Sequence, residues 1–172
     1  LVGSEMCIRD SDYAEDAESE EDAIEDYPVT LFLSQHGYFK KITPQSLRMS
    51  GEQKFKEDDA LSMSVESSNA AELMFFTDKA QVYKTRASDF ADGKASQLGD
   101  YLPAKLGMDE GESVMGMVLP GDYSGYMIFF FENGKAAKVE LSAYKTTSNR
   151  RRLTGAYSDK SPLKALLYLK ED

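Results

Sequence analysis

The sequence predicts an all-β protein made of about three four-stranded blades in a propeller-like partial ring. Three observations lead to this fold class: one residue plan recurs three times, each copy contains a β-hairpin signal, and the segments between copies hold further strands but no convincing helix. The copies are LFLSQHGYFKKITPQSL (31–47), MFFTDKAQVYKTRASDF (74–90) and IFFFENGKAAKVELSAY (128–144).

Each copy is predicted to be a hairpin that can be aligned on one lysine, namely Lys41, Lys84 or Lys138. The half before the turn is nearly all apolar, β-branched or aromatic, as a buried strand would be, and the half after it is mixed, as in a more exposed partner strand. The third copy turns at Asn-Gly, the strongest short hairpin signal, and the other two turns occupy the same place.

The segments between the hairpins also match one another. KEDDALSMSV (56–65) parallels DEGESVMGMV (109–118), each an acidic turn followed by a short strand. A period of about 40–55 residues with four strands per unit is typical of a blade. The last segment, SPLKALLYLKED, begins another strand, and we expect the chain to be a piece of a longer protein.

The formal charge of −10 is concentrated near the N-terminus. Residues 1–28 hold 11 of the 30 acidic residues and one of the 20 basic ones, so the remainder is balanced. We expect residues 12–26 to be a disordered acidic linker. Residues 1–11, LVGSEMCIRDS, resemble the translation of a transposase-type sequencing adaptor, so we expect an artefactual segment, a non-native Cys7 and a bacterial source.

Composition excludes several classes of protein. No apolar run approaches the ~20 residues of a membrane span. One cysteine and one histidine exclude a Cys/His zinc site and a disulfide framework. No phosphate-binding or dinucleotide glycine motif and no nucleophile–base pair is present, so we expect no active site, cofactor or metal in this chain.

The repeats resemble the C-terminal domains of the A subunits of DNA gyrase and topoisomerase IV, bacterial type IIA topoisomerases. The resemblance lies in IEDYPVTLFLSQHGYFKKI, AELMFFTDKAQVYKTRASDF, FENGKAAKVELSAY and NRRRLTGAYSDKSPL, the last two being similar to Gram-positive, clostridial-type relatives. It implies a β-pinwheel over residues 27–172, whose blades exchange strands, with repeats near 27–66, 67–118 and 119–172.

The same resemblance implies that duplex DNA bends around a basic outer rim. The parent enzyme would be an ATP-dependent type II topoisomerase whose catalytic tyrosine lies in a breakage–reunion domain outside this chain. Its partners would be double-stranded DNA, that domain, and the ATPase B subunit. ATP and Mg would act through other domains, and the protein would be cytoplasmic, associated with the nucleoid and not with a membrane.

One departure concerns the glutamine–arginine–arginine–glycine box with which gyrase wraps DNA. The nearest stretches, MSGEQKFK (49–56) and SNRRRLTG (148–155), do not match it. A topoisomerase IV-like subunit, or a gyrase piece without the blade that bears the box, therefore fits better.

Basic residues that follow the hairpin turns are the candidate DNA contacts. Their recurrence alone does not separate phosphate contact from ordinary solubilising lysines, and the family resemblance favours phosphate contact. Such contacts position a duplex without specifying its sequence. The arginine triplet is the strongest candidate, since guanidinium groups pair well with phosphate oxygens. The predicted set is Lys40, Lys41, Arg48, Lys54, Lys56, Lys84, Arg86, Lys138, Lys145, Arg150, Arg151 and Arg152.

Other conspicuous residues have ordinary explanations. We expect His36 to be a solvated turn residue. We expect the phenylalanines to be blade core and not stacking platforms for single strands, and the acidic clusters to be solvated turns and not cation sites. The phenylalanines are Phe75, Phe76, Phe129, Phe130 and Phe131. The acidic residues are Glu57, Asp58, Asp59, Asp109, Glu110 and Glu112.

A propeller-type protein-interaction module without nucleic-acid binding is the alternative function. The near-neutral body favours it, because a dedicated DNA-binding domain usually carries a basic excess. The two functions differ in whether the lysines and the arginine triplet share one face.

Overall fold

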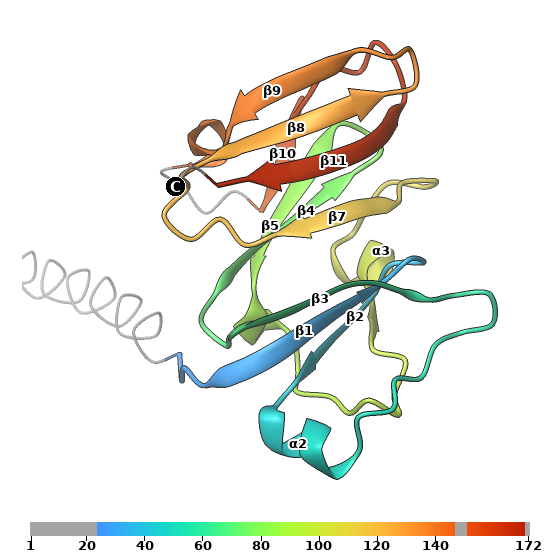
Figure 1. Cartoon of the computed structure of the whole chain (residues 1–172), viewed down its shortest axis with the longest axis vertical. Coiled ribbons are helices and arrows are strands. Elements are labelled where there is room, and N and C mark those ends of the chain that lie inside the picture. The colour runs from blue at the N-terminus through green and yellow to red at the C-terminus, as the bar shows by residue number, and fades with distance from the viewer. Residues whose placement is uncertain (1–23, 147–150, 171–172) are drawn as a thin grey trace, which may run out of the picture.

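The structure, a computed structural model, describes residues 24–146 and 151–170, and its regular elements are mostly β-strands. Three antiparallel sheets stack along the long axis of the molecule (Figure 1). Sheet A has the order β3-β1-β2-β6, sheet B has β10-β5-β4-β7, and sheet C has β11-β8-β9. The predicted all-β blade architecture is therefore confirmed, with three strands in place of four in the described part of sheet C.

The strands are short, as blade strands are. Sheet A contains β1 (Pro28–Ser34), β2 (Tyr38–Ile42), β3 (Leu61–Ser68) and β6 (Asp100–Tyr101). Sheet B contains β4 (Glu72–Thr77), β5 (Gln81–Arg86), β7 (Val114–Val118) and β10 (Arg152–Thr154). Sheet C contains β8 (Tyr126–Phe131), β9 (Ala136–Glu140) and β11 (Leu163–Leu169).

The three predicted hairpins are β1–β2, β4–β5 and β8–β9, and their registers are equivalent. Lys41 lies opposite Leu31, Lys84 opposite Met74, and Lys138 opposite Ile128. The strands expected after the acidic turns are also present, as β3 and β7, and each pairs with the first strand of its hairpin. The repeat deduced from the sequence is thus a structural repeat.

The sheets exchange edge strands, as the resemblance implies. β6 lies between β5 and β7 in sequence, yet it pairs with β2 of sheet A. β10 lies between β9 and β11 in sequence, yet it pairs with β5 of sheet B. Each of these two sheets therefore receives its last strand from the repeat that follows it.

A glycine is required where the first exchanged strand begins. Gly99 has φ +93°, a region that side-chain-bearing residues rarely occupy. A Cβ atom there would lie 2.4 Å from the carbonyl oxygen of Phe39. The close approach of β6 to β2 therefore depends on the missing side chain.

Helical segments are short and lie between strands: α2 (Pro44–Met49), α3 (Leu102–Lys105) and two 3₁₀ turns, η1 (Ala87–Asp89) and η2 (Leu141–Tyr144). The Thr43 hydroxyl caps α2 by accepting a hydrogen bond from the Ser46 amide at 3.3 Å. In the part of the chain that the structure describes, no helix is long and apolar enough to cross a membrane.

The hydrophobic core fills the two gaps between the sheets. Along β4, Leu73 and Phe75 join the cluster shared with sheet A, whereas Met74 and Phe76 join the cluster shared with sheet C. Because successive side chains of a strand point to opposite faces, sheet B is buried on both sides. This explains why β4 is an unbroken apolar run, as a doubly covered strand requires.

Residues 1–11, most of the acidic linker, and Arg150 lie outside the described residues. The last two residues of the linker make tertiary contacts. The Glu25 carbonyl accepts a hydrogen bond from Asn69 at 2.7 Å, and the Asp26 carboxylate accepts one from the Ala70 amide at 3.0 Å. The chain is therefore tied to the second repeat just before β1 begins.

Candidate nucleic-acid interface

The predicted basic residues separate into buried and exposed groups. Lys40 and Lys41 have exposed fractions of 5% and 3%, and the side chain of Lys84 is 10% exposed. Arg48, Lys54, Lys56, Arg86, Lys138, Lys145, Arg151 and Arg152 are exposed. The paired lysines of β2 therefore do not present ammonium groups at the surface, and only the exposed group can meet a ligand there without rearrangement.

Lys40 holds two loops together from inside. Its ammonium group donates hydrogen bonds to Gln53 Oε1 at 3.1 Å and to the carbonyls of Lys54 and Ala95 at 2.9 and 3.1 Å. Burial lowers the pKa of this ammonium group. No carboxylate pairs with it among the described residues, so the carbonyl dipoles and the ring of Phe55, 5.3 Å away, offset its desolvation.

Lys41 and Lys84 connect consecutive repeats. The Lys41 ammonium lies 2.6 Å from Asn69 Oδ1 and 3.2 Å from Asp92 Oδ1. The Lys84 ammonium lies 3.4 Å from Glu72 Oε1, and it donates to the Tyr144 carbonyl and Thr146 Oγ1 at 3.3 and 3.2 Å. The recurrence of these lysines therefore has a structural cause, and DNA contact by them stays a prediction.

Four of the exposed basic residues, Lys54, Lys56, Arg151 and Arg152, lie near corresponding edges of sheets A and B. Lys54 and Lys56 lie in the segment that Lys40 fastens beside β2, and the Lys54 amide also donates to the Ala95 carbonyl at 2.8 Å. At the β5 edge of sheet B, the Arg151 carbonyl accepts a hydrogen bond from the Lys84 amide at 2.6 Å, and Arg152 begins β10. Both edges are those that receive an exchanged strand.

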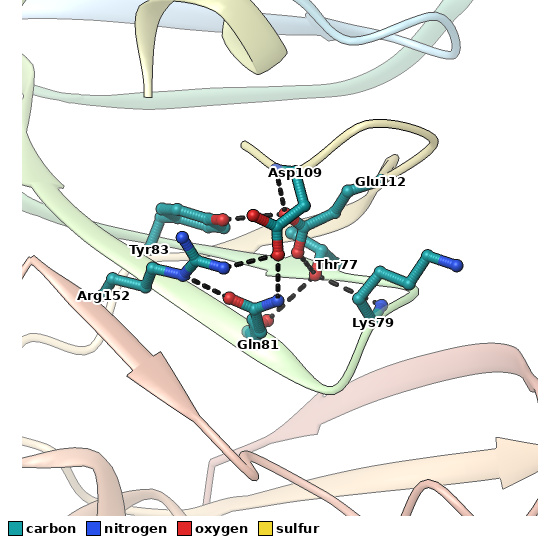
Figure 2. A network of polar contacts seen from close by, with 7 residues as sticks. All are labelled: Thr77, Lys79, Gln81, Tyr83, Asp109, Glu112 and Arg152. Atoms are coloured by element: carbon teal, nitrogen blue, oxygen red, sulfur yellow. Dashed lines mark hydrogen bonds and ion pairs between the residues drawn. The ribbon is translucent and has the colours of Figure 1, made fainter. Parts of the chain in front are cut away.

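Arg152 is held by a polar network on sheet B (Figure 2). Its guanidinium lies 2.5 Å from Asp109 Oδ2, donates to Gln81 Oε1, and sits 5.6 Å above the ring of Tyr83. The hydrogen bond from Gln81, followed by the contacts with Arg152, lowers the pKa of Asp109. The arginine is thus preoriented, but part of its charge is already balanced.

Glu112 forms the buried half of the same polar network. The sequence analysis did not predict this role for Glu112. Its carboxylate accepts hydrogen bonds from the Thr77 hydroxyl at 2.5 Å, the Tyr83 hydroxyl at 2.7 Å and the Asp109 amide at 3.0 Å. Its exposed fraction is 4%, so the expectation of a solvated turn is wrong for this residue. Burial, and then the hydrogen bond to Glu112, raise the pKa of Tyr83.

The aromatic residues behave as expected with one exception. Phe75, Phe76 and Phe129 are fully buried and Phe131 nearly so, in agreement with a role in the blade core. Phe130 is 41% exposed, because it lies on the outer face of sheet C. His36 is exposed in the β1–β2 turn, and no group of three or more His, Cys, Asp or Glu side chains arranged to hold a metal occurs among the described residues.

Three stacked sheets, two of which receive a strand from the repeat that follows, define a β-pinwheel. Comparison with solved structures agrees with this fold class. The C-terminal domain of DNA topoisomerase IV gives a TM-score of 0.75 at 22% identity, over 84% of this chain and 46% of that one. The C-terminal domain of E. coli ParC gives 0.63 at 16% identity, over 84% of this chain and 57% of that one.

Sequence comparison gives relatives of the same kind. The DNA gyrase A subunit of Mycoplasma pneumoniae is 30% identical over 73% of this chain and 16% of its own length. The DNA topoisomerase 4 A subunit of Staphylococcus epidermidis is 29% identical over 84% of this chain and 19% of its own length. No protein-family model matches the chain.

The homologues of this chain are A subunits of DNA gyrase and topoisomerase IV, and its structural neighbours are the C-terminal domains of those subunits. The chain spans less than a fifth of the length of these two relatives.

Proposed function

We propose that this chain binds and bends duplex DNA as the C-terminal domain of a type II topoisomerase A subunit. The observation that carries the proposal is the placement of exposed basic side chains at the same edge of two successive sheets, beside the exchanged strands. In a protein homologous to the A subunits of gyrase and topoisomerase IV, this repeated edge offers phosphate contacts one blade apart.

The parent enzyme would pass one duplex through another with the aid of ATP. In that setting the domain would hold DNA near the breakage–reunion domain of the same polypeptide, and the ATPase B subunit would complete the assembly in the bacterial cytoplasm. ATP and Mg would act in the other domains, and this chain would contribute only DNA positioning.

Contacts between basic side chains and phosphates predict that the binding constant for duplex DNA falls steeply with salt concentration, because phosphate neutralisation releases counterions. The test is fluorescence anisotropy of labelled duplexes of unrelated sequence over a series of salt concentrations. The variant Lys54→Gln/Lys56→Gln should lower the salt slope by about two and weaken binding uniformly across sequences. The matched control is Lys160→Gln/Lys164→Gln, which removes two exposed charges from the third repeat.

Equal binding by the test and control variants would contradict the edge assignment. Bending can be followed separately by energy transfer between dyes on the two ends of one duplex. A complex that leaves the end-to-end distance unchanged would reduce the proposal to binding alone.

A protein-interaction module is the second candidate, because Lys41 and Lys84 do not lie on a shared exposed rim and the body is near neutral. Absence of duplex binding at low salt, with the chain folded, would favour this function.

A further inference from the structure

An open cleft of about 610 Å³ lies at the junction of the first and second repeats. The first repeat contributes the β1–β2 turn, Tyr38 and Lys56 to its lining, and the second contributes Tyr101 and residues 112–114. Its volume lies within the range of roughly 300–1,000 Å³ usual for small-ligand sites, which often form where two structural units meet. The cleft is therefore a candidate ligand site.

The two sides of this cleft are fastened by backbone hydrogen bonds. The His36 amide donates to Asp59 Oδ1 at 3.0 Å, which fixes the β1–β2 turn. The Leu102 amide, just after β6, donates to the Gly37 carbonyl at 2.9 Å, which holds the exchanged strand against that turn. The shape of the cleft is therefore set by the fold and depends on strand exchange.

Tyr38 and Tyr101 form an aromatic wall. The two residues lie opposite each other in the β2–β6 register, with ring centroids 5.0 Å apart and ring planes at 38°. Tyr101 is 46% exposed, so part of its ring stays open to a ligand. An open aromatic ring is a stacking surface for any nucleobase, because every base has a π-face. The wall therefore favours a planar aromatic ligand.

A cation lies beside the aromatic wall. Lys56 is exposed, and its Nζ lies 5.4 Å from the centre of the Tyr38 ring. The hydrogen bond with the Tyr38 hydroxyl raises the pKa of Lys56, so its ammonium group is charged at neutral pH. The exposed ring of His36 adds a second hydrogen-bonding group to the lining. An ammonium group in this place suits a phosphate.

Glu112 also lines the cleft, but its carboxylate belongs to the polar network on sheet B (Figure 2). It accepts hydrogen bonds from the hydroxyl groups of Thr77 and Tyr83 and from the Asp109 amide, and the residue is only 4% exposed. These donors offset its charge. Lys56 is therefore the exposed charged side chain that a ligand meets in this lining.

The aromatic pair is particular to the first junction. Gln81 lies three positions before Lys84, as Tyr38 lies three before Lys41, and its partner on the exchanged strand β10 is Thr154. Strand exchange at the second junction thus proceeds with a Gln–Thr pair. Packing between repeats does not require two tyrosines here, which leaves ligand binding as a role for their open surface.

We propose that this cleft binds a nucleoside monophosphate unit, with its base stacked on Tyr101 and its phosphate beside Lys56. The side chains of His36 and Gln35 supply hydrogen bonds to the same ligand. The unit is either a free nucleotide or an unpaired nucleotide of a DNA strand, since the two share this chemistry. The second source rests on the proposed DNA binding, whereas the first does not.

The first arm of the test uses small probes. Deoxyadenosine monophosphate, deoxyadenosine and inorganic phosphate are each titrated into the isotope-labelled chain, and the amide shifts of residues 35–38 and 99–101 are followed by NMR. The nucleotide should bind at least about fivefold more tightly than either fragment, because stacking and phosphate contact then act together. Tyr101→Leu should weaken nucleotide binding at least about fivefold. Phe130→Leu, at a similarly exposed ring on sheet C, should leave it unchanged.

The second arm compares a blunt duplex with the same duplex carrying a short single-stranded overhang, by fluorescence anisotropy. If DNA is the source, the overhang should tighten binding at least about fivefold, and Tyr101→Leu should remove this difference without changing the affinity for the blunt duplex. Nucleotide binding without an overhang preference would assign the cleft to a free nucleotide.

Three results would overturn the proposal. The first is the absence of both nucleotide binding and an overhang preference. The second is inorganic phosphate binding as tightly as the nucleotide, or equal effects of Tyr101→Leu and Phe130→Leu. The third is a loss of blunt-duplex affinity in Tyr101→Leu, which would make Tyr101 an ordinary duplex contact. Binding of the blunt duplex by the native chain tests the proposed function separately, so the two failures are distinguishable.

Discussion

The guanidinium of Arg152 lies 2.5 Å from the carboxylate of Asp109, and this contact joins the exchanged strand β10 to the loop before β7. Both side chains are substantially exposed, at 40% and 55%. An ion pair so open to water adds little to stability. Its larger effect concerns the charge that Arg152 can offer to an anion.

Replacing Asp109 with Asn should therefore strengthen DNA binding. Removal of the carboxylate leaves the Arg152 charge unbalanced, while an amide can still accept its hydrogen bond. We expect the dissociation constant at low salt to fall by about threefold, which corresponds to the weak coupling of exposed charges. Anisotropy with labelled duplexes measures this, and Glu110→Gln removes the same charge from an exposed neighbour. An equal effect of both variants would mean that the stronger DNA binding comes from the change in net charge alone and not from Arg152.

Replacing Glu112 with Ala should destabilise the fold. The change leaves the buried Tyr83 hydroxyl and the Asp109 amide without their acceptor, and the Thr77 hydroxyl keeps only the Gln81 carbonyl, at 3.4 Å. The free energy of unfolding should fall by about 1–3 kcal/mol for the unsatisfied donors. Urea unfolding followed by circular dichroism measures the loss. Glu110→Ala should change the midpoint little, and a similar midpoint for the two variants would mean that the network does not stabilise sheet B.

Replacing Lys41 with Ala should act on stability and not only on ligand binding. The Asn69 side chain, 6% exposed, would lose its donor, whereas Asp92 is open enough to be solvated. The expected loss is about 1–3 kcal/mol of unfolding free energy. Lys54→Ala, at an exposed position, should cost less than about 0.5 kcal/mol. If the two variants unfolded at the same urea concentration, the connecting role of Lys41 would be wrong.

Stability should decrease at alkaline pH, in part because of Tyr27. Its burial, and then its hydrogen bonds to the Asp92 carboxylate, raise its pKa to about 12 from the ordinary value of about 10. A group whose folded pKa is raised stabilises the protein fully below its unfolded pKa, and this contribution is lost as the pH rises from about 10 through about 12. Tyr27→Phe should therefore reduce the decline in unfolding free energy across this range, measured by urea unfolding at successive pH values. An unchanged slope would contradict the assignment.

Replacing Gly99 with Ala should disrupt the docking of β6 on sheet A. The added Cβ would lie 2.4 Å from the Phe39 carbonyl oxygen, at φ +93°. We expect a loss of about 3 kcal/mol or more, since backbone strain and a steric clash add together. Gly107 also has a positive φ, +66°, but open space around its Cβ position. Gly107→Ala should cost only about 1–2 kcal/mol, and comparable losses would show that strain alone, without the clash, decides the effect.

Hairpins and blade strands could be predicted from the sequence because their signals are local. Turn residues, apolar runs and the aligned lysines all lie within one copy of the repeat. The environment of those lysines could not be predicted in the same way. Lys41 is buried by Asn69 and Asp92, which belong to the next repeat, and the residue types at these two positions differ in the third repeat.

Phe130 and Glu112 illustrate two different limits of predicting side-chain burial from the sequence. Three consecutive phenylalanines on one strand must alternate between faces, so the exposure of Phe130 depends on whether a sheet covers the outer face. Glu112 lies in an acidic turn whose composition indicates solvent exposure. Its burial follows from Thr77 and Tyr83, whose hydroxyl groups approach from another strand pair.

The exchange of strands also sets the order in which the protein can be completed during its synthesis. Sheet A gains β6 only after the ribosome has made the second hairpin, and sheet B gains β10 only after the third. Until then, the outer edges of β2 and β5 expose unpaired peptide groups of the kind that pair wrongly with other chains. Each blade of a nascent chain therefore stays open to mispairing for the time needed to translate its successor, and the protein becomes resistant to aggregation only one repeat at a time.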